Sequence, residues 1–314
     1  MNFRTLDLNL LRVFDAVMVE RNVTRAAARL AMSQPAVSNA LRRLRDATGE
    51  DLFVPGSTGM APTPHAQALW PAVRAAMDAL RGAFDSNGFD PRHDERCFTL
   101  CMADATADVL LPALVGHVQR ERLRVDLRVL PLATRDPRPQ IDQGLADAAV
   151  GFFPDVEVAQ ATEGGKGMTV LDALYACEYV CVMRAGHPLA GEGELMGLDA
   201  YCSAHHLRVS FAGRQRGFVD EALARLGRRR RVVMTVSHFS TAACVVRDSD
   251  LLTVLPRSFV PATGFAQSLA VRPLPFAVPA IEVGLLWHRR HERDAGQRWL
   301  RDAVVQAARA VDPG

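Results

Sequence analysis

The stretch that decides the N-terminal fold runs from residue 21 to residue 45 and reads RNVTRAAARLAMSQPAVSNALRRLR. Thr24 is predicted to cap a short helix, in which the small side chains of residues 26–28 allow another helix to approach closely. Ser33 is predicted to cap the next helix. Because only residues 31–32 separate the two helices, the spacing predicts a helix-turn-helix.

The second of these helices has an apolar stripe and a polar face. Pro35 is tolerated in its first turn, where the amide hydrogen that proline lacks is not needed. The predicted buried stripe consists of Val37, Leu41 and Leu44. Groups that can read base edges lie on Gln34, Ser38, Asn39, Arg42 and Arg45, with Arg43 placed to reach phosphate. Residues 21–45 hold six arginines and no acid, which indicates a local basic patch. The alternative is a solvated face in an unrelated helical bundle.

Elements on both sides complete a winged domain. Asp7 is predicted to cap a first helix whose apolar face consists of Leu10, Leu11, Phe14, Val17 and Met18. A strand at 52–54, a turn at 56–59 and a returning edge at 60–63 predict a wing. A helix is predicted from 64 to 84, and it carries a coiled-coil-like seam of Leu69, Val73, Ala76 and Leu80, with Trp70, Met77 and Phe84 beside it. Such a helix predicts dimerisation.

These residues resemble the N-terminal region of the LysR-type transcriptional regulators. The resemblance rests on DLNLL at 7–11, VF at 13–14, AA at 26–27 with Leu30, SQPAVS at 33–38, LR at 44–45, LF at 52–53 and PTP at 62–64. Within the family, residues 39–41 and 62–64 resemble the branch of nodulation and aromatic-catabolism regulators. Pro55 stands where the family usually has a wing arginine, which puts a wing contact with phosphate in doubt, and Ala66 replaces its usual glycine.

The resemblance implies a winged helix-turn-helix, a linker helix and an effector domain in a cytoplasmic transcriptional regulator. It also implies a homodimer or homotetramer on double-stranded DNA with an inverted-repeat operator, RNA polymerase as a partner and no cofactor. The expected DNA-binding residues are Thr24, Arg25, Ser33, Gln34, Pro35, Ser38, Asn39, Arg42, Arg43 and Arg45. Six of these match the family's recognition-helix positions, namely Ser33, Gln34, Pro35, Ser38, Asn39 and Arg42.

The rest of the chain alternates helical and strand-like patterns, which indicates an α/β fold with parallel sheets flanked by helices. Strands are expected at 97–103, 124–130, 148–152, 207–209, 232–236 and 251–254, and helices at 107–121, 140–144, 218–226 and 241–246. We therefore divide the chain into a DNA-binding domain at 1–64, a linker helix and hinge at 65–90 and a regulatory domain at 91–314. Two lobes, at about 97–175 with 269–314 and at about 176–268, would resemble the type II periplasmic-binding-protein fold that the family uses.

A small-molecule effector is expected beyond the carboxyl ends of the strands, where loops meet helix N-termini. This rule selects Asp104, Thr106, Phe152, Ser210, Phe211, Ser237, His238 and Phe239. Polar caps mixed with phenylalanines suit an aromatic acid or a phenol. Asp104 disfavours a carboxylate directly beside it, and each polar residue has an alternative role as a helix cap.

The composition and the motifs that are absent from the sequence exclude several classes of protein. About half of the 314 residues are hydrophobic and the net charge is only +2, so any nucleic-acid partner must be met by a local patch. We find no phosphate loop, no nucleophile elbow and no zinc-ligand cluster, which argues against an enzyme. No signal peptide or membrane span is recognised, which argues against a transport solute-binding protein. The run 228–231 is interpreted as a solvated turn, and the six cysteines as mostly buried, with Cys202 and Cys244 open to redox roles.

Overall fold

The protein is represented by a computed structural model that describes residues 6–56, 59–84, 88–163, 167–191, 196–211, 216–278 and 281–311. The described residues form two compact units, one consisting mainly of residues up to 87 and the other of residues from 88 onward.

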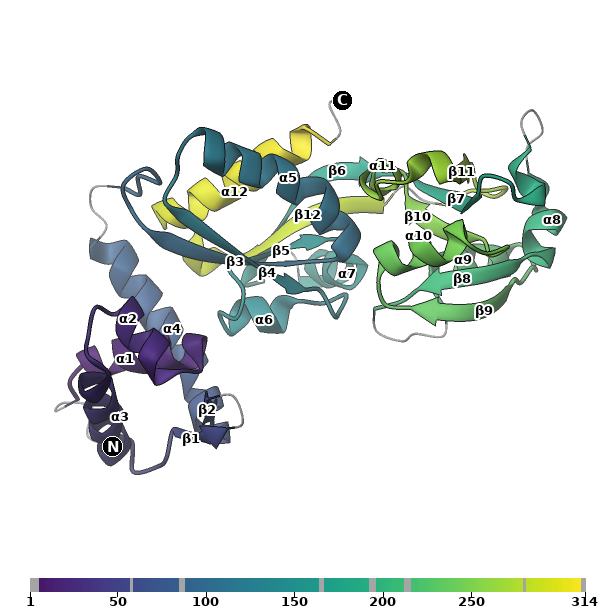
Figure 1. Cartoon of the computed structure of the whole chain (residues 1–314). Coiled ribbons are helices and arrows are strands. Elements are labelled where there is room, and N and C mark those ends of the chain that lie inside the picture. The colour runs from purple at the N-terminus through teal and green to yellow at the C-terminus, as the bar shows by residue number, and fades with distance from the viewer. Residues whose placement is uncertain are drawn as a thin grey trace. The chain divides into compact units, whose positions relative to one another are not determined.

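The N-terminal unit is a winged helix-turn-helix with a long following helix. Its elements are α1 (Asn9–Glu20), α2 (Val23–Arg29), α3 (Gln34–Thr48), β1 (Phe53–Gly56), β2 (Gly59–Pro62) and α4 (Pro64–Phe84) (Figure 1). Strands β1 and β2 pair antiparallel and form the predicted wing, whose turn residues 57–58 lie outside the described residues. The apolar faces meet in one core around the fully buried Phe14, Val17, Ala26, Val37 and Leu44. The apolar spacing thus predicted these helices and their buried faces.

Capping contacts fix where the helices begin. Ser33 caps α3 as predicted, since its Oγ accepts a hydrogen bond from the Ala36 amide at 3.4 Å. The prediction for α2 was wrong, because Asn22 has the extended backbone of an N-cap and its side chain accepts from the Arg25 amide, whereas Thr24 lies inside the helix.

The long helix α4 uses much of its apolar seam within its own unit. Val73 is buried in the core of the winged domain, and Trp70 beside it donates an indole hydrogen bond of 2.8 Å to Asp15. Farther along, Ala76 is exposed and Leu80 is 44% exposed. Phe84, which was also expected on this face, lies outside the described side chains. The exposed end of the seam therefore remains the part available to a partner.

The first lobe of the larger unit is a five-stranded sheet in the order β4-β3-β5-β12-β6. Its strands are β3 (Arg96–Met102), β4 (Val125–Pro131), β5 (Ala148–Gly151), β6 (Thr169–Cys177) and β12 (Ile281–His288). Helices α5 (Asp104–Arg120) and α12 (Ala295–Arg309) cover one face, and α6 (Arg138–Asp142) and α7 (Pro154–Glu163) cover the other (Figure 1). A 3-10 turn, η4 (Arg289–His291), follows β12.

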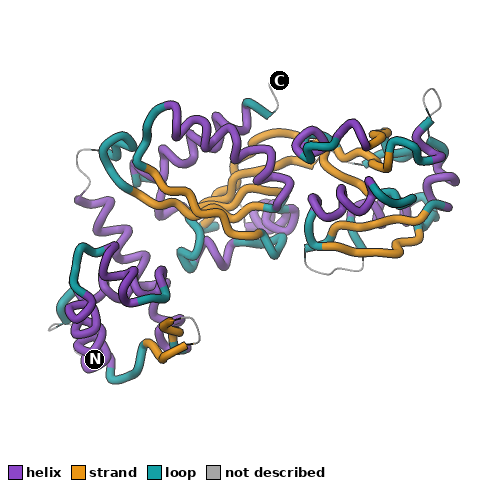
Figure 2. The backbone as a smooth tube through the Cα atoms, viewed as in Figure 1, coloured by secondary structure: helices purple, strands orange, loops and turns teal. Residues whose placement is uncertain are grey.

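The second lobe contains β7 (Tyr179–Arg184), β8 (His205–Val209), β9 (Arg231–Val236), β10 (Thr253–Pro256) and β11 (Leu269–Arg272). The pairs run β10-β7-β11 and β8-β9, and one parallel bridge between His206 and Leu252 joins them. Helices α8 (Leu198–Ser203), α9 (Phe218–Arg225), α10 (Phe239–Arg247) and α11 (Phe259–Ala262) flank the strands, with 3-10 turns η2 (Pro188–Ala190) and η3 (Ala266–Ser268) (Figure 2).

The α/β class is confirmed, but the sheets are mixed rather than purely parallel. β3 is parallel to β4 and β5, and β8 is parallel to β9. By contrast, β12 runs antiparallel to β5 and β6, because it brings the chain back from the second lobe beside the strand that leaves the first. β11 pairs with β7, so the second lobe extends past the expected end at 268.

Candidate functional site

The polar face of α3 is open to solvent. All the residues expected to meet DNA are exposed, namely Thr24, Arg25, Ser33, Gln34, Pro35, Ser38, Asn39, Arg42, Arg43 and Arg45. On the opposite side, Val37, Ala40 and Leu44 are buried against the other helices. The core therefore anchors α3 by one face and leaves the amide, hydroxyl and guanidinium groups of the other face free to reach a groove.

The charge on this surface differs from what the acid-free run of residues 21–45 indicates. Acids from neighbouring segments pair with most of its arginines. Glu20 lies 3.1 Å from Arg29 and 3.6 Å from Arg25. Asp7 lies 3.1 Å from Arg43. The basic patch is thus weaker in space than in sequence.

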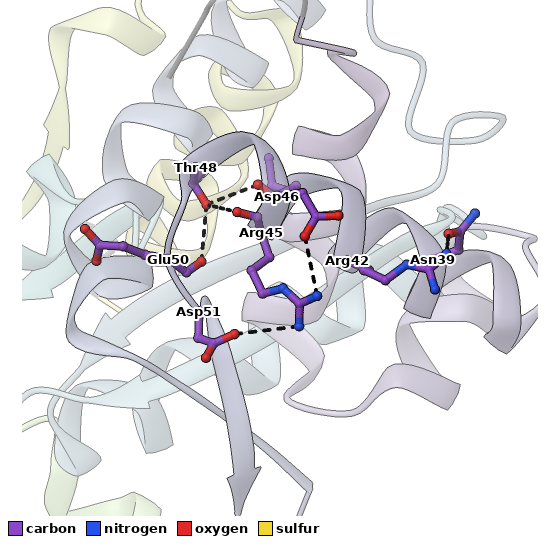
Figure 3. A network of polar contacts seen from close by, with 8 residues as sticks. Asn39, Arg42, Arg45, Asp46, Thr48, Glu50 and Asp51 are labelled. Atoms are coloured by element: carbon purple, nitrogen blue, oxygen red, sulfur yellow. Dashed lines mark hydrogen bonds and ion pairs between the residues drawn. The ribbon is translucent and has the colours of Figure 1, made fainter.

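Arg42 is the exception among the arginines of α3. Arg45 contacts Asp46 at 3.4 Å and Asp51 at 3.9 Å, whereas Arg42 donates to the side-chain oxygen of Asn39 at 2.6 Å (Figure 3). Within the described residues Arg42 has no ion pair, so its charge is not neutralised inside the domain. A guanidinium held beside an amide is a pair of groups suited to reading base edges.

A cavity of about 150 Å³ lies between the two lobes of the larger unit. Its walls combine the carboxyl ends of strands β3, β5 and β8 with the first turns of α5, α9 and α10. This is the place that the rule for open α/β sheets selects. Five of the residues expected around an effector line it, namely Thr106, Phe152, Ser210, Phe211 and Phe239.

The other three expected residues do not line this cavity, which corrects their placement. The Asp104 carboxylate instead accepts hydrogen bonds from the backbone amide and hydroxyl of Ser240, at 2.8 and 3.1 Å, and so joins the first turns of α5 and α10. Ser237 and His238 are exposed and contact each other at 2.9 Å, because α10 begins only at Phe239 and these residues precede its first turn.

Aromatic rings form one side of the cavity. Tyr179 packs edge-on against Phe218 with ring centroids 5.0 Å apart, and Phe211 packs similarly against Phe239 at 5.5 Å. Tyr175 also lines the cavity, and burial raises the pKa values of Tyr175 and Tyr179, so both phenols stay neutral donors. The two tyrosines were missed, since β6 and β7 were not recognised as strands. Phe218 was missed although a helix was predicted at 218–226, because its first residue was not expected to face the cavity.

Arginines form another side, and they too were not predicted from the sequence. Arg230 is 4% exposed and contacts Asp220 at 2.8 Å, while Arg208 approaches the same carboxylate at 3.7 Å. Burial opposes ionisation of Asp220, but hydrogen bonds from Arg230 and the Gly217 amide hold its pKa below the usual range. The interpretation of 228–231 as a solvated turn is therefore wrong for Arg230. The sequence did hold a signal for this ion pair. Asp220 follows Gly217 by three residues in the first turn of α9, and the basic run 228–231 leads directly into β9.

Arg135 and Arg216 add further positive charge to the lining. Arg135 has no ion pair within the described part of the chain. With Arg208 and Arg230, four guanidinium groups therefore line this cavity, and none of the described residues in its lining is an acid. An anionic group suits this environment better than a neutral one.

The histidines and cysteines were examined as possible metal ligands or redox groups. His206 is fully buried, its Nε2 lies 2.8 Å from the Tyr201 carbonyl oxygen, and burial lowers its pKa to about 4. Within the described residues no three metal-ligating side chains gather. All six cysteines are described and are free thiols, and Cys244 is the exposed one. In the same residues no helix is long and apolar enough to cross a membrane.

Comparison with known proteins gives matches over nearly the whole chain. Residues 8–67 match the family described as bacterial regulatory helix-turn-helix protein, lysR family, and residues 91–309 match the LysR substrate binding domain. The HTH-type transcriptional activator NahR of Pseudomonas putida is 34% identical over 305 residues, which cover 97% of this chain and 98% of that protein. Nodulation protein D 1 of Rhizobium meliloti is 33% identical over 322 residues, covering 100% and 98%. The crystal structure of the probable transcriptional regulator PA0477 from Pseudomonas aeruginosa is 31% identical, covers 99% of both chains and has a TM-score of 0.76.

Proposed function

The chain belongs to the LysR family of bacterial regulators, and we propose that its effector is an aromatic carboxylate bound between the lobes of the larger unit. As a member of this family it is a DNA-binding transcriptional regulator that responds to a small-molecule effector and acts as an oligomer, and it is not an enzyme.

The choice of effector rests on one observation. The same cavity is lined by a cluster of aromatic rings and by four guanidinium groups. Tyr179, Phe218 and Phe239 offer edges and faces to a planar ring. Arg208 and Arg230 both contact Asp220, while Arg135 and Arg216 form no ion pair within the residues that the structure describes. A ring that carries a carboxylate satisfies both sides, because charge-assisted hydrogen bonds to a carboxylate are stronger than those to a neutral group. The carboxylate lies toward the arginines and away from Asp104.

The DNA-binding surface is the polar face of α3, with Ser33, Gln34, Ser38, Asn39 and Arg42 in the major groove and with Thr24, Arg25, Pro35, Arg43 and Arg45 at its edges. The exposure of these side chains supports this assignment. Two copies joined through the exposed end of α4, around Leu80, present two such helices to an inverted-repeat operator. Because its partner is the chromosome, the protein works in the cytoplasm, with RNA polymerase as a further partner.

The effector proposal is tested by calorimetric titration of the full chain with aromatic carboxylates, each paired with its primary amide. We expect saturable binding of at least one carboxylate, about tenfold or more tighter than its amide, which corresponds to about 1.4 kcal/mol. Arg208→Gln should remove this preference, whereas Arg231→Gln, an exposed arginine of β9 outside the cavity, should keep it. Equal binding of acids and amides, or no binding of either, would contradict the proposal.

A further inference from the structure

The second lobe holds another cavity, of about 370 Å³, which shares Arg208, Arg216 and Arg230 with the lining of the first. It lies between α9 and β9, and its apolar lining consists of Leu223, Ala224 and Val232. Its charged lining consists of Arg208, Arg216, Asp220, Arg228, Arg229 and Arg230. Five guanidinium groups therefore line a single depression together with one carboxylate.

Among the described residues, the lining of this cavity has more guanidinium groups than carboxylates. Arg208 and Arg230 share Asp220, and Arg228 pairs with Asp199 at 2.8 Å. Arg216 and Arg229 form no ion pair within the residues that the structure describes. Two of the five guanidinium groups that line the cavity, those of Arg216 and Arg229, are thus left without an acidic partner among the described residues.

We propose that this cavity is a second ligand site, which binds a compact oxyanion carrying two or more negative charges. The depth of the site favours a small ion over a protein surface. Arg230 is 4% exposed and Arg208 is 14% exposed, whereas Arg228 at the opening is 49% exposed. A flat partner would meet only the outer arginines, but a phosphate or carboxylate group can reach the inner ones. Guanidinium groups bind such oxyanions through two parallel hydrogen bonds.

The location of the site gives it a regulatory consequence. Arg208, Arg216 and Arg230 line both cavities, so an anion in the second one acts on the same guanidinium groups as the effector does in the first. Each ligand then changes the affinity for the other by the same factor. This consequence rests on the proposed function, whereas the anion site itself does not.

The test is calorimetric titration of the full chain, without effector, with pyrophosphate and with citrate, at matched ionic strength against sodium chloride. We expect saturable binding of one ion per chain, and the two arms identify whether a polyphosphate or a polycarboxylate fits. Arg229→Gln should weaken binding at least about tenfold, and Arg228→Gln should do the same, equivalent to about 1.4 kcal/mol each. Both residues are exposed, so neither change threatens the fold.

Matched controls are Arg225→Gln on α9 and Arg231→Gln on β9, two exposed arginines that do not line the cavity. They should leave the affinity within about twofold. The proposal is overturned if neither ion binds saturably, or if all four variants weaken binding equally, as diffuse screening would cause.

Discussion

The backbone of Gly59 passes so close to Arg21 that a Cβ atom on Gly59 would lie 2.4 Å from the Arg21 carbonyl oxygen. That oxygen also accepts a hydrogen bond of 2.9 Å from the Met60 amide. Gly59 has a φ of +139°, where side chains are strained as well. The wing is thus fastened to the turn between α1 and α2, and this contact sets the wing relative to the recognition helix.

The first prediction is that Gly59→Ala destabilises the N-terminal unit more than Gly49→Ala does. Gly49 also has a positive φ, of +79°, but a Cβ there meets no atom within 4 Å. Gly49→Ala should cost about 1–2 kcal/mol of unfolding free energy from backbone strain alone. Gly59→Ala should cost a further 1–3 kcal/mol, roughly that of overpacking. Urea denaturation followed by circular dichroism measures both, and equal costs would show that the close approach does not matter.

The second prediction concerns the ion pair between Arg96 and Asp294. The guanidinium donates two hydrogen bonds of 2.8 and 2.9 Å to a carboxylate that is only 7% exposed and also caps α12. Burial opposes ionisation, but these bonds hold the pKa of Asp294 below its usual value. Its stabilisation is therefore complete above the unfolded pKa of about 4 and is lost as pH falls through the lower folded pKa.

Asp294→Asn should accordingly lower the unfolding free energy by about 3–5 kcal/mol at pH 7, as expected when one partner of a buried pair is removed. The difference from the unmutated protein should shrink below about pH 4. The control is Asp248→Asn, which breaks an exposed pair with Arg247 and should leave the unfolding free energy nearly unchanged, because solvent screens such a pair. A loss for Asp294→Asn that is the same at pH 3 and pH 7 would refute the assignment.

The third prediction separates residues inside the effector cavity from those outside it. Thr106 lines the cavity, whereas His238 is exposed and does not. Thr106→Val should weaken effector binding about three- to tenfold, the size of one lost hydrogen bond, and leave DNA affinity without effector unchanged. His238→Ala should change neither quantity. Titration of both variants with the tightest carboxylate of the panel provides the check, and a larger effect of His238→Ala would relocate the site.

The sequence predicts well whatever depends on near neighbours. The N-cap at Ser33, the buried spacing of Val37 and Leu44 and the length of α4 are all set by contacts within a few residues. These local rules place the recognition helix and its exposed face. They fail where two local signals compete, as at the start of α2, where both Asn22 and Thr24 are good caps and the extended backbone at Asn22 decides.

The effector cavity depends instead on contacts between distant segments. Trp287 of β12 donates a hydrogen bond of 2.7 Å to Asp172 of β6, which lies 115 positions earlier. The hydrophobic periodicity of the sequence does not predict that these two strands pair. Tyr179 and Arg230 reach the cavity only because such strands assemble the lobes. Residues after strand ends, such as Thr106 and Phe211, were predictable, because the topology of open sheets alone selects them.

Arg42 provides the sharpest test of whether α3 reads base sequence. The measurement is the affinity of the full chain for a duplex that it selects from a randomised pool, divided by its affinity for a scrambled duplex. Arg42→Ala should lower this ratio about 10- to 100-fold, the discrimination expected of one base contact. Arg29→Ala removes the same charge from an arginine that Glu20 neutralises, and should keep the ratio. An unchanged ratio in a folded Arg42→Ala variant would show that α3 does not read the base sequence through this residue.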